Sequence, residues 1–143
     1  MNGRIFHNIA SVQRRGDGAI AIHEPHIPEQ SLAYYKSVVE KLGQSSVDSF
    51  MRFYVTPGAS HGGAGISSLD GAALPQGVDL LDAIDGWADR GTAPGPLVQV
   101  AQESKPPFAV TASRTMCRYP QWPRYMGGPP KDAASFSCVG ESE

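Results

Sequence analysis

Two short apolar runs flank one amphipathic helix in the first part of this chain, and that order constrains its fold more than any other feature. Ala19–Ile22 is a continuous apolar run of the kind that buried parallel strands show, and Phe50–Val55 is rich in aromatic residues. Between them, Pro28–Gly43 has apolar residues at three- and four-residue steps, proline at its start and glycine at its end. The order strand, helix, strand predicts a right-handed crossover between parallel strands.

The second half of the chain continues this alternation. Val78–Arg90 is predicted to be a second amphipathic helix, with acidic residues early, arginine late and Gly91 as its C-terminal cap. Leu97–Val100 and Phe108–Thr111 then have the pattern of two short strands that form a terminal pair. Alternating strands and helices predict an α/β fold built on a parallel sheet.

Three segments have less regular patterns. Within His7–Arg15, Ile9 and Val12 stand at helical spacing, which predicts a short helix that Gly16 stops. Gln44–Asp48 is polar and is predicted to be a turn. Ser113–Glu143 is rich in proline, glycine and aromatic residues, which predicts a loop-rich tail.

Composition excludes several classes of function. The chain has 143 residues, enough for one domain or for part of a larger one. Its net charge of -2 gives no basic surface for nucleic acid, and no apolar run approaches the ~20 residues that span a bilayer. No His, Cys and Asp residues stand at metal-ligand spacing, so neither a metal nor another cofactor is expected.

The two cysteines, Cys117 and Cys138, are not in a CxxC arrangement, so a redox or zinc motif is not supported. A disulfide between them would imply an oxidising compartment. In contrast, Met1–His7 lacks the apolar core of a secretory signal peptide. A start within a longer parent sequence would reconcile the two observations.

His61 is the first candidate functional residue. It lies among glycines in Gly58–Gly65, directly after the aromatic strand. A buried strand fixes the start of such a loop while the loop leaves the imidazole accessible, which suits a catalytic base. The alternative is an ordinary surface histidine.

Several segments resemble, in order, the C-terminal half of the tannase and feruloyl esterase family. The resemblance covers residues 8–139 as one domain segment and leaves 1–7 and 140–143 as termini. The segments are Ser11–Gly16, Ala19–His23, Ile27–Ser31 with Tyr34 and Tyr35, Asp48–Phe53 with Pro57, Gly58 and His61, Trp87 with Gly91–Pro94, and Cys117–Gln121 with Arg124, Tyr125 and Asp132–Cys138.

This resemblance implies a secreted or periplasmic serine esterase of α/β-hydrolase fold that acts on esters of phenolic acids. His61 occupies the position of the family's catalytic histidine, and Cys117 and Cys138 match its C-terminal disulfide. The family's nucleophilic serine lies in an upstream half that this chain does not contain, so association with such a half is expected. Ser60 is not a substitute, because neighbours in sequence do not normally place a hydroxyl against the imidazole. Tyr34, Tyr35 and Trp87 are expected in the core.

The chain departs from the family at two further points. Gly62 replaces a cysteine that usually follows the histidine. The loop His23–Pro28 is shorter than the family's and lacks its aspartate, which leaves Glu24 as the only acid there. Glu24 is therefore either the acid that orients His61 or a surface carboxylate. These departures keep a second hypothesis open, namely a non-catalytic fragment or remnant domain without hydrolase activity.

Overall fold

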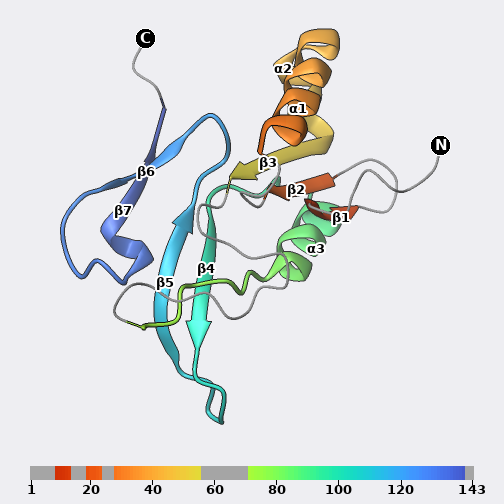
Figure 1. The fold of residues 1–143 in the computed structure, drawn as a ribbon. Coiled ribbons are helices and arrows are strands. Elements are labelled where there is room, and N and C mark those ends of the chain that lie inside the picture. Colours follow the sequence, from red (N-terminus) through yellow and green to blue (C-terminus); the bar gives the residue numbers. More distant parts are fainter. Residues whose placement is uncertain (1–8, 14–18, 24–27, 56–70, 141–143) are drawn as a thin grey trace. The chain divides into compact units, whose positions relative to one another are not determined.

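The computed structural model (Figure 1) divides the chain into two compact units. It describes residues 9–13, 19–23, 28–55 and 71–140. One unit is Met1–Pro57 with Leu80–Pro94, and the other is Gly58–Asp79 with Gly95–Glu143. Each unit is thus built from two separate stretches of sequence.

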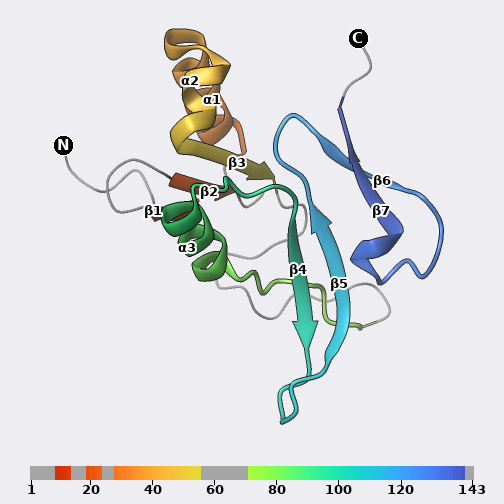
Figure 2. The ribbon, with the colours of Figure 1, turned by 180° about the vertical axis from the view of Figure 1, so that it is seen from behind.

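The first unit contains a three-stranded sheet in the order β1–β2–β3 (Figure 2). Its strands are β1 (Ile9–Gln13), β2 (Ala19–His23) and β3 (Met51–Val55). Strands β2 and β3 are parallel, as the crossover predicts, and their register pairs Ala19 with Met51 and His23 with Val55. Strand β1 runs antiparallel to β2, so the sheet is mixed.

The helix predicted within His7–Arg15 was wrong, because Ile9–Gln13 is strand β1. A segment this short does not hold a helix by itself, since nucleation fixes several residues for a single hydrogen bond. Pairing with β2 instead satisfies backbone groups on an edge that would otherwise be open. Tertiary pairing therefore overrides the local spacing of Ile9 and Val12.

Helix α1 (Pro28–Leu42) connects β2 to β3 and confirms the predicted crossover helix. Proline suits its first turn, where a backbone N–H would lack a helical partner, and Lys41 complements the dipole at the last turn. Tyr35 is 3% exposed, as expected of a core residue. Tyr34 is 54% exposed, so its expected place in the core was wrong: it lies one residue, or about 100°, around the helix from Tyr35.

Gln44–Asp48 is not a turn but the start of helix α2 (Gln44–Phe50). Gly43 alone separates the two helices, at φ 81°, and its N–H donates to Val39 O at 2.8 Å. That left-handed backbone favours glycine. Val47 is fully buried, and its N–H donates to Gly43 O at 3.1 Å. One buried valine on a polar segment gives little periodicity, which explains the wrong prediction.

Helix α3 (Leu80–Arg90) confirms the second predicted helix, which begins two residues later than expected. Ile84, Gly86 and Trp87 are buried, and Trp87 is in the core as expected. Gly91 has φ 67°, and its N–H donates to Trp87 O at 3.1 Å, which ends the helix at the expected cap.

The second unit contains the expected terminal pair, β4 (Leu97–Gln102) and β5 (Val110–Met116), as an antiparallel hairpin. Strand β5 begins two residues later than predicted, because Phe108 has φ 56°, and it extends to Met116, into the predicted loop-rich tail. Gly77 adds an isolated bridge to Val100. The hairpin is a separate two-stranded sheet, so the expected extension of the parallel sheet beyond β2 and β3 is not found among the described residues. Local pairing through a short turn favours the antiparallel arrangement.

The tail is more regular than predicted. It forms β6 (Trp122–Tyr125), the 3₁₀ turn η1 (Ala133–Ser135) and β7 (Phe136–Val139), with β6 and β7 antiparallel. Strand β5 holds the turn, because Thr115 Oγ1 donates to Ala133 O at 2.8 Å and Ser113 Oγ accepts from Ala133 N at 2.8 Å. Such side-chain bonds leave no periodic pattern in a sequence.

The tail is also joined covalently to the residue that follows β5. Cys117 and Cys138 form a disulfide with a Cα–Cα distance of 5.5 Å, in the pairing that the resemblance implies. Both cysteines belong to the second unit, in which Cys117 is 4% exposed and Cys138 is half-buried. Among the helices that the structure describes, none is long and apolar enough to cross a membrane.

Replacing both cysteines with alanine is expected to lower the free energy of unfolding by about 3 kcal/mol, since the disulfide closes a loop with a sequence separation of 21. Urea unfolding followed by circular dichroism measures the change. The control is Ser137→Ala, at an exposed residue beside Cys138 on β7. An unchanged midpoint in the double variant would contradict the expectation.

Val47→Ala is expected to destabilise the chain by about 2 kcal/mol, because it removes buried methyl groups from α2, which packs on α1 and β3, and leaves a cavity. The matched change Val55→Ala, at a residue that is 40% exposed, should cost less than about 1 kcal/mol. Thermal melts of the two variants test this. Equal shifts would show that Val47 is not a core residue.

Candidate functional site

His61 and Glu24, the predicted base and acid, both lie outside the described residues. The structure does describe the strands that precede them. Glu24 follows β2 directly, and five residues separate the end of β3 from His61. Because His23 and Val55 are register partners in a parallel pair, β2 and β3 end at the same edge of the sheet. That edge, at the carboxyl ends of parallel strands, is where functional groups of α/β sheets gather.

Strand β3 buries side chains on both faces. Phe53 is 1% exposed and stacks on Tyr35 of α1, with ring centroids 5.0 Å apart. Because strand side chains alternate between faces, Arg52 and Tyr54 point the opposite way. Tyr54 is fully buried. Strand β3 therefore packs on both of its faces, through Phe53 on one and Tyr54 on the other.

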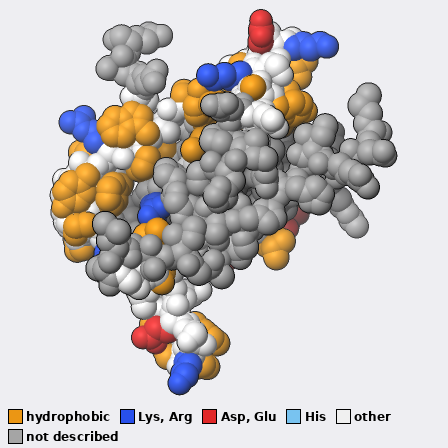
Figure 3. Space-filling view, in the orientation of Figure 1, with side chains coloured by type: hydrophobic (Ala, Val, Ile, Leu, Met, Phe, Trp, Pro, Cys, Tyr) orange, Lys and Arg blue, Asp and Glu red, His pale blue; other side chains and the backbone are white. Residues whose placement is uncertain are grey.

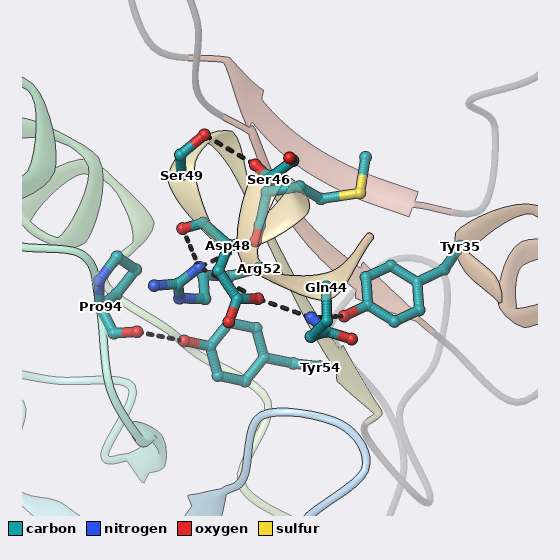
Figure 4. Close-up of polar contacts among 9 residues, drawn as sticks. Tyr35, Gln44, Ser46, Asp48, Ser49, Arg52, Tyr54 and Pro94 are labelled. Carbon is teal, nitrogen blue, oxygen red and sulfur yellow. Dashed lines mark hydrogen bonds and ion pairs between the residues drawn. The ribbon is translucent and has the colours of Figure 1, made fainter. Parts of the chain in front are cut away.

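Arg52 forms the centre of a polar cluster at the start of β3 (Figure 4). Its Nη1 donates to the backbone oxygens of Asp48 and Met51, the latter at 3.1 Å. The same nitrogen lies 3.8 Å from Asp48 Oδ1. The guanidinium carbon stands 5.2 Å from the ring centroid of Trp87, a cation–π distance. Arg52 therefore connects α2, β3 and α3.

Tyr54 makes a second connection on the same face of β3. Its hydroxyl donates to Pro94 O at 3.1 Å (Figure 4). Pro94 lies just beyond α3, after Gly91. Proline cannot use its own nitrogen as a donor, but its carbonyl remains a good acceptor. The hydroxyl thus joins the last part of β3 to the segment after α3.

A third connection lies on the α1 side. Gln44 Nε2 donates to Tyr35 Oη at 3.1 Å and to Asp48 Oδ1 at 2.6 Å (Figure 4). The Asp48 carboxylate therefore accepts a hydrogen bond from Gln44 and forms an ion pair with Arg52. Through these contacts the cluster connects α1 and α2 to β3. Among the described residues no group of three or more His, Cys, Asp or Glu side chains could hold a metal ion.

The model of the family described as "Tannase and feruloyl esterase" matches residues 20–139. The chain belongs to this family. A probable feruloyl esterase of Arthroderma benhamiae is 35% identical over 113 residues, which are 78% of this chain and 20% of that protein. An uncharacterized esterase of Agrobacterium fabrum is 37% identical over 109 residues, 75% of this chain and 18% of that protein.

Solved structures agree with the sequence relatives. Feruloyl esterase B from Aspergillus oryzae superposes with a TM-score of 0.61 at 29% identity, over 78% of this chain and 24% of that one. This chain therefore has the same fold as one part of a known esterase. The chain spans about a fifth to a quarter of the length of these relatives.

Arg52 was part of the motif that revealed the family, but sequence alone gave it no role. No sequence pattern gave Tyr54 a role either. The signal that the sequence did offer was the alternation along β3. One face carries Met51, Phe53 and Val55, and the other carries Arg52 and Tyr54. Their partners Trp87 and Pro94 come much later in the chain, and no local pattern identifies them.

A double-mutant cycle with Arg52→Gln and Trp87→Leu is expected to give a coupling free energy of about 1 kcal/mol, as for a largely shielded cation–π pair. Chemical denaturation of the wild type, both single variants and the double variant measures it. Arg52→Gln combined with Val98→Ala, on β4, is the control and should be additive. Additivity in the Arg52 and Trp87 cycle would contradict the contact.

Proposed function

We propose that this chain is the histidine-bearing part of a carboxylic ester hydrolase of α/β-hydrolase fold that acts on esters of phenolic acids. The observation that carries the proposal is the parallel pairing of β2 and β3 in a member of the tannase and feruloyl esterase family. Strands β2 and β3, which precede Glu24 and His61 in the sequence, end at the same edge of the sheet, and this supports the proposal. The relatives named as feruloyl esterases support the substrate class.

In this proposal a serine from an upstream part attacks the ester carbonyl carbon. His61 accepts the serine proton and passes it to the departing alcohol. Water then hydrolyses the acyl-serine by the same relay. Glu24 orients the imidazole and stabilises its charged form, a role that glutamate fills in some α/β-hydrolases.

Ser60 is not assigned as the nucleophile, although Gly58–Gly62 has the letters G-x-S-x-G. That motif exposes a serine only where a strand turns sharply into a helix. Two of the three residues that follow are glycines, Gly63 and Gly65, which are poor helix formers. The serine is therefore expected in the upstream part.

Association with that upstream part completes the proposal. The chain spans about a fifth of its sequence relatives. The second unit also exposes large hydrophobic side chains on and beside β6 (Figure 3): Trp122 is 49%, Tyr125 51% and Met126 65% exposed. Exposed apolar patches are typical of interaction surfaces. The disulfide supports an oxidising compartment, either secreted or periplasmic.

The test joins this chain to the upstream part of the Agrobacterium fabrum esterase, in place of the stretch that it matches. Hydrolysis of methyl ferulate is expected from the chimera and not from the chain alone. His61→Ala should lower kcat by about 1000-fold or more, and Glu24→Gln by about 100-fold or more. Hydrolysis of p-nitrophenyl acetate alone would argue against the phenolic-acid substrate.

Two matched variants serve as controls. His26→Ala changes a histidine with no assigned role, and Ser60→Ala changes the neighbour of His61, so both should leave kcat unchanged. A chimera that melts cooperatively but hydrolyses neither ester would favour the non-catalytic remnant. Loss of activity in Ser60→Ala would contradict the proposal that the nucleophilic serine comes from the upstream part.

A further inference from the structure

Among the described strands of the first unit, β2 alone is paired on both edges, with β1 on one side and β3 on the other (Figure 2). The β3 side is a parallel ladder, in which His23 is the partner of Val55. The β1 side is antiparallel along the whole of β2, and there Ile9 is the partner of His23. The direction of pairing therefore reverses across β2.

The sequences of β1 and β2 suit different places in a sheet. Strand β2 is Ala-Ile-Ala-Ile-His, a nearly continuous apolar run of the kind found inside parallel sheets. Strand β1 is less apolar, since it contains Ser11 and Gln13, and Arg14 and Arg15 follow it at once. Antiparallel strands on otherwise parallel sheets are typically edge strands, and charged residues are common at edges. The sequence of β1 is therefore that of an edge strand, and the sequence of β2 is that of an interior strand.

We propose that β1 is a covering strand, which occupies the edge of β2 on which the sheet continues when the upstream part is present. Assembly with that part then replaces the antiparallel ladder of β1 and β2 by a parallel ladder between β2 and an upstream strand. This inference rests on the proposed function, in which the chain completes an α/β-hydrolase. It adds to that function the edge that assembles and the segment that has to leave it.

The edge of β2 fits an upstream strand better than the outer edge of β1 does. Strands that are consecutive in an α/β sheet are usually neighbours, so the strand before β2 in the parallel sheet is expected beside β2. On the outer edge of β1 the same strand would make β1 an interior strand, and interior strands of such sheets are apolar along nearly their whole length. The relatives, of which this chain spans about a fifth, have the length for further strands.

Strand β1 is well placed to cover this edge while the upstream part is absent. Five residues, 14–18, separate it from β2, so closing the connection costs little entropy. Its pairing satisfies an edge of β2 that would otherwise present open N–H and C=O groups. Strand β1 also contacts α3 within the same unit. An upstream strand has further strands beside it, which extend the sheet, so the exchange is favoured when that part is present.

The test introduces pairs of cysteines at register partners of β1 and β2, in the full chain and in the chimera with the upstream part of the Agrobacterium fabrum esterase. The pairs are Ser11→Cys with Ala21→Cys and Ala10→Cys with Ile22→Cys. Neighbouring pairs of an antiparallel ladder alternate in spacing, so one of the two has the closer geometry for a disulfide. Ser11→Cys with Ile20→Cys, one residue out of register, is the control.

Under mild oxidation the free chain is expected to form the cross-link in at least one in-register pair, and the chimera is expected to lose it. Peptide mass spectrometry identifies the cross-link, and the native cysteines are already paired with each other. Equal cross-linking in the free chain and in a chimera that melts cooperatively would overturn the proposal. So would a free chain that forms the cross-link in neither in-register pair.

A variant of the free chain decides the question if the chimera does not fold. Ser11→Pro with Val12→Pro removes at least one donor of the ladder, because neighbouring N–H groups along a strand point to opposite sides. The opened edge of β2 is expected to make this variant self-associate in sedimentation, whereas Ser11→Thr with Val12→Ile keeps both donors and should behave as the wild type. A proline variant that does not self-associate would contradict the proposal. These readouts need no turnover, so they are independent of whether the chimera hydrolyses an ester.

Discussion

The packing of β3 between two groups of side chains is the constraint on which the first unit depends. Phe53 faces the stacked ring of Tyr35, while Arg52 and Tyr54 face Trp87 and Pro94. One side is aromatic and apolar, and the other combines a cation with a phenol hydroxyl. A shift of β3 by one residue would exchange these faces and place the arginine against α1. The register of β3 against β2 is thereby fixed by chemistry on both sides.

The second unit is stabilised in a different way. Its buried residues include Gln99, Met116, Cys117 and Ser135, a more polar set than that of the first unit. Side-chain hydrogen bonds from β5 to η1 and the disulfide to β7 hold the tail in place. Small apolar cores often rely on such covalent and polar support. Reducing conditions are therefore expected to destabilise the second unit more than the first.

Sequence reasoning predicted the features with a local cause. Helices α1 and α3 have a clear apolar period, and Gly43 and Gly91 mark their ends. The parallel pairing of β2 and β3 follows from their order. Ordered motifs identified the family, and the cysteine pair matched its disulfide.

The remaining features depend on contacts between segments that are distant in the sequence. Strand β1 is stabilised by the edge of β2, and α2 by the burial of Val47. The roles of Arg52 and Tyr54 become visible only beside Trp87 and Pro94. His61 and Glu24 stay predictions, because they rest on motif position, and the structure describes only the strands that lead to them.

Gly43 has a consequence for how this family can vary in length. It is the single residue between α1 and α2, so an insertion or deletion there would change the placement of α2 against α1. Val47 would then no longer be buried in the core, and Asp48 would no longer contact Arg52. The turn between β4 and β5, by contrast, is exposed from Gln102 to Val110. Relatives that keep this packing should therefore differ in length at the turn between β4 and β5. The connection from β2 to β3 should keep a constant length.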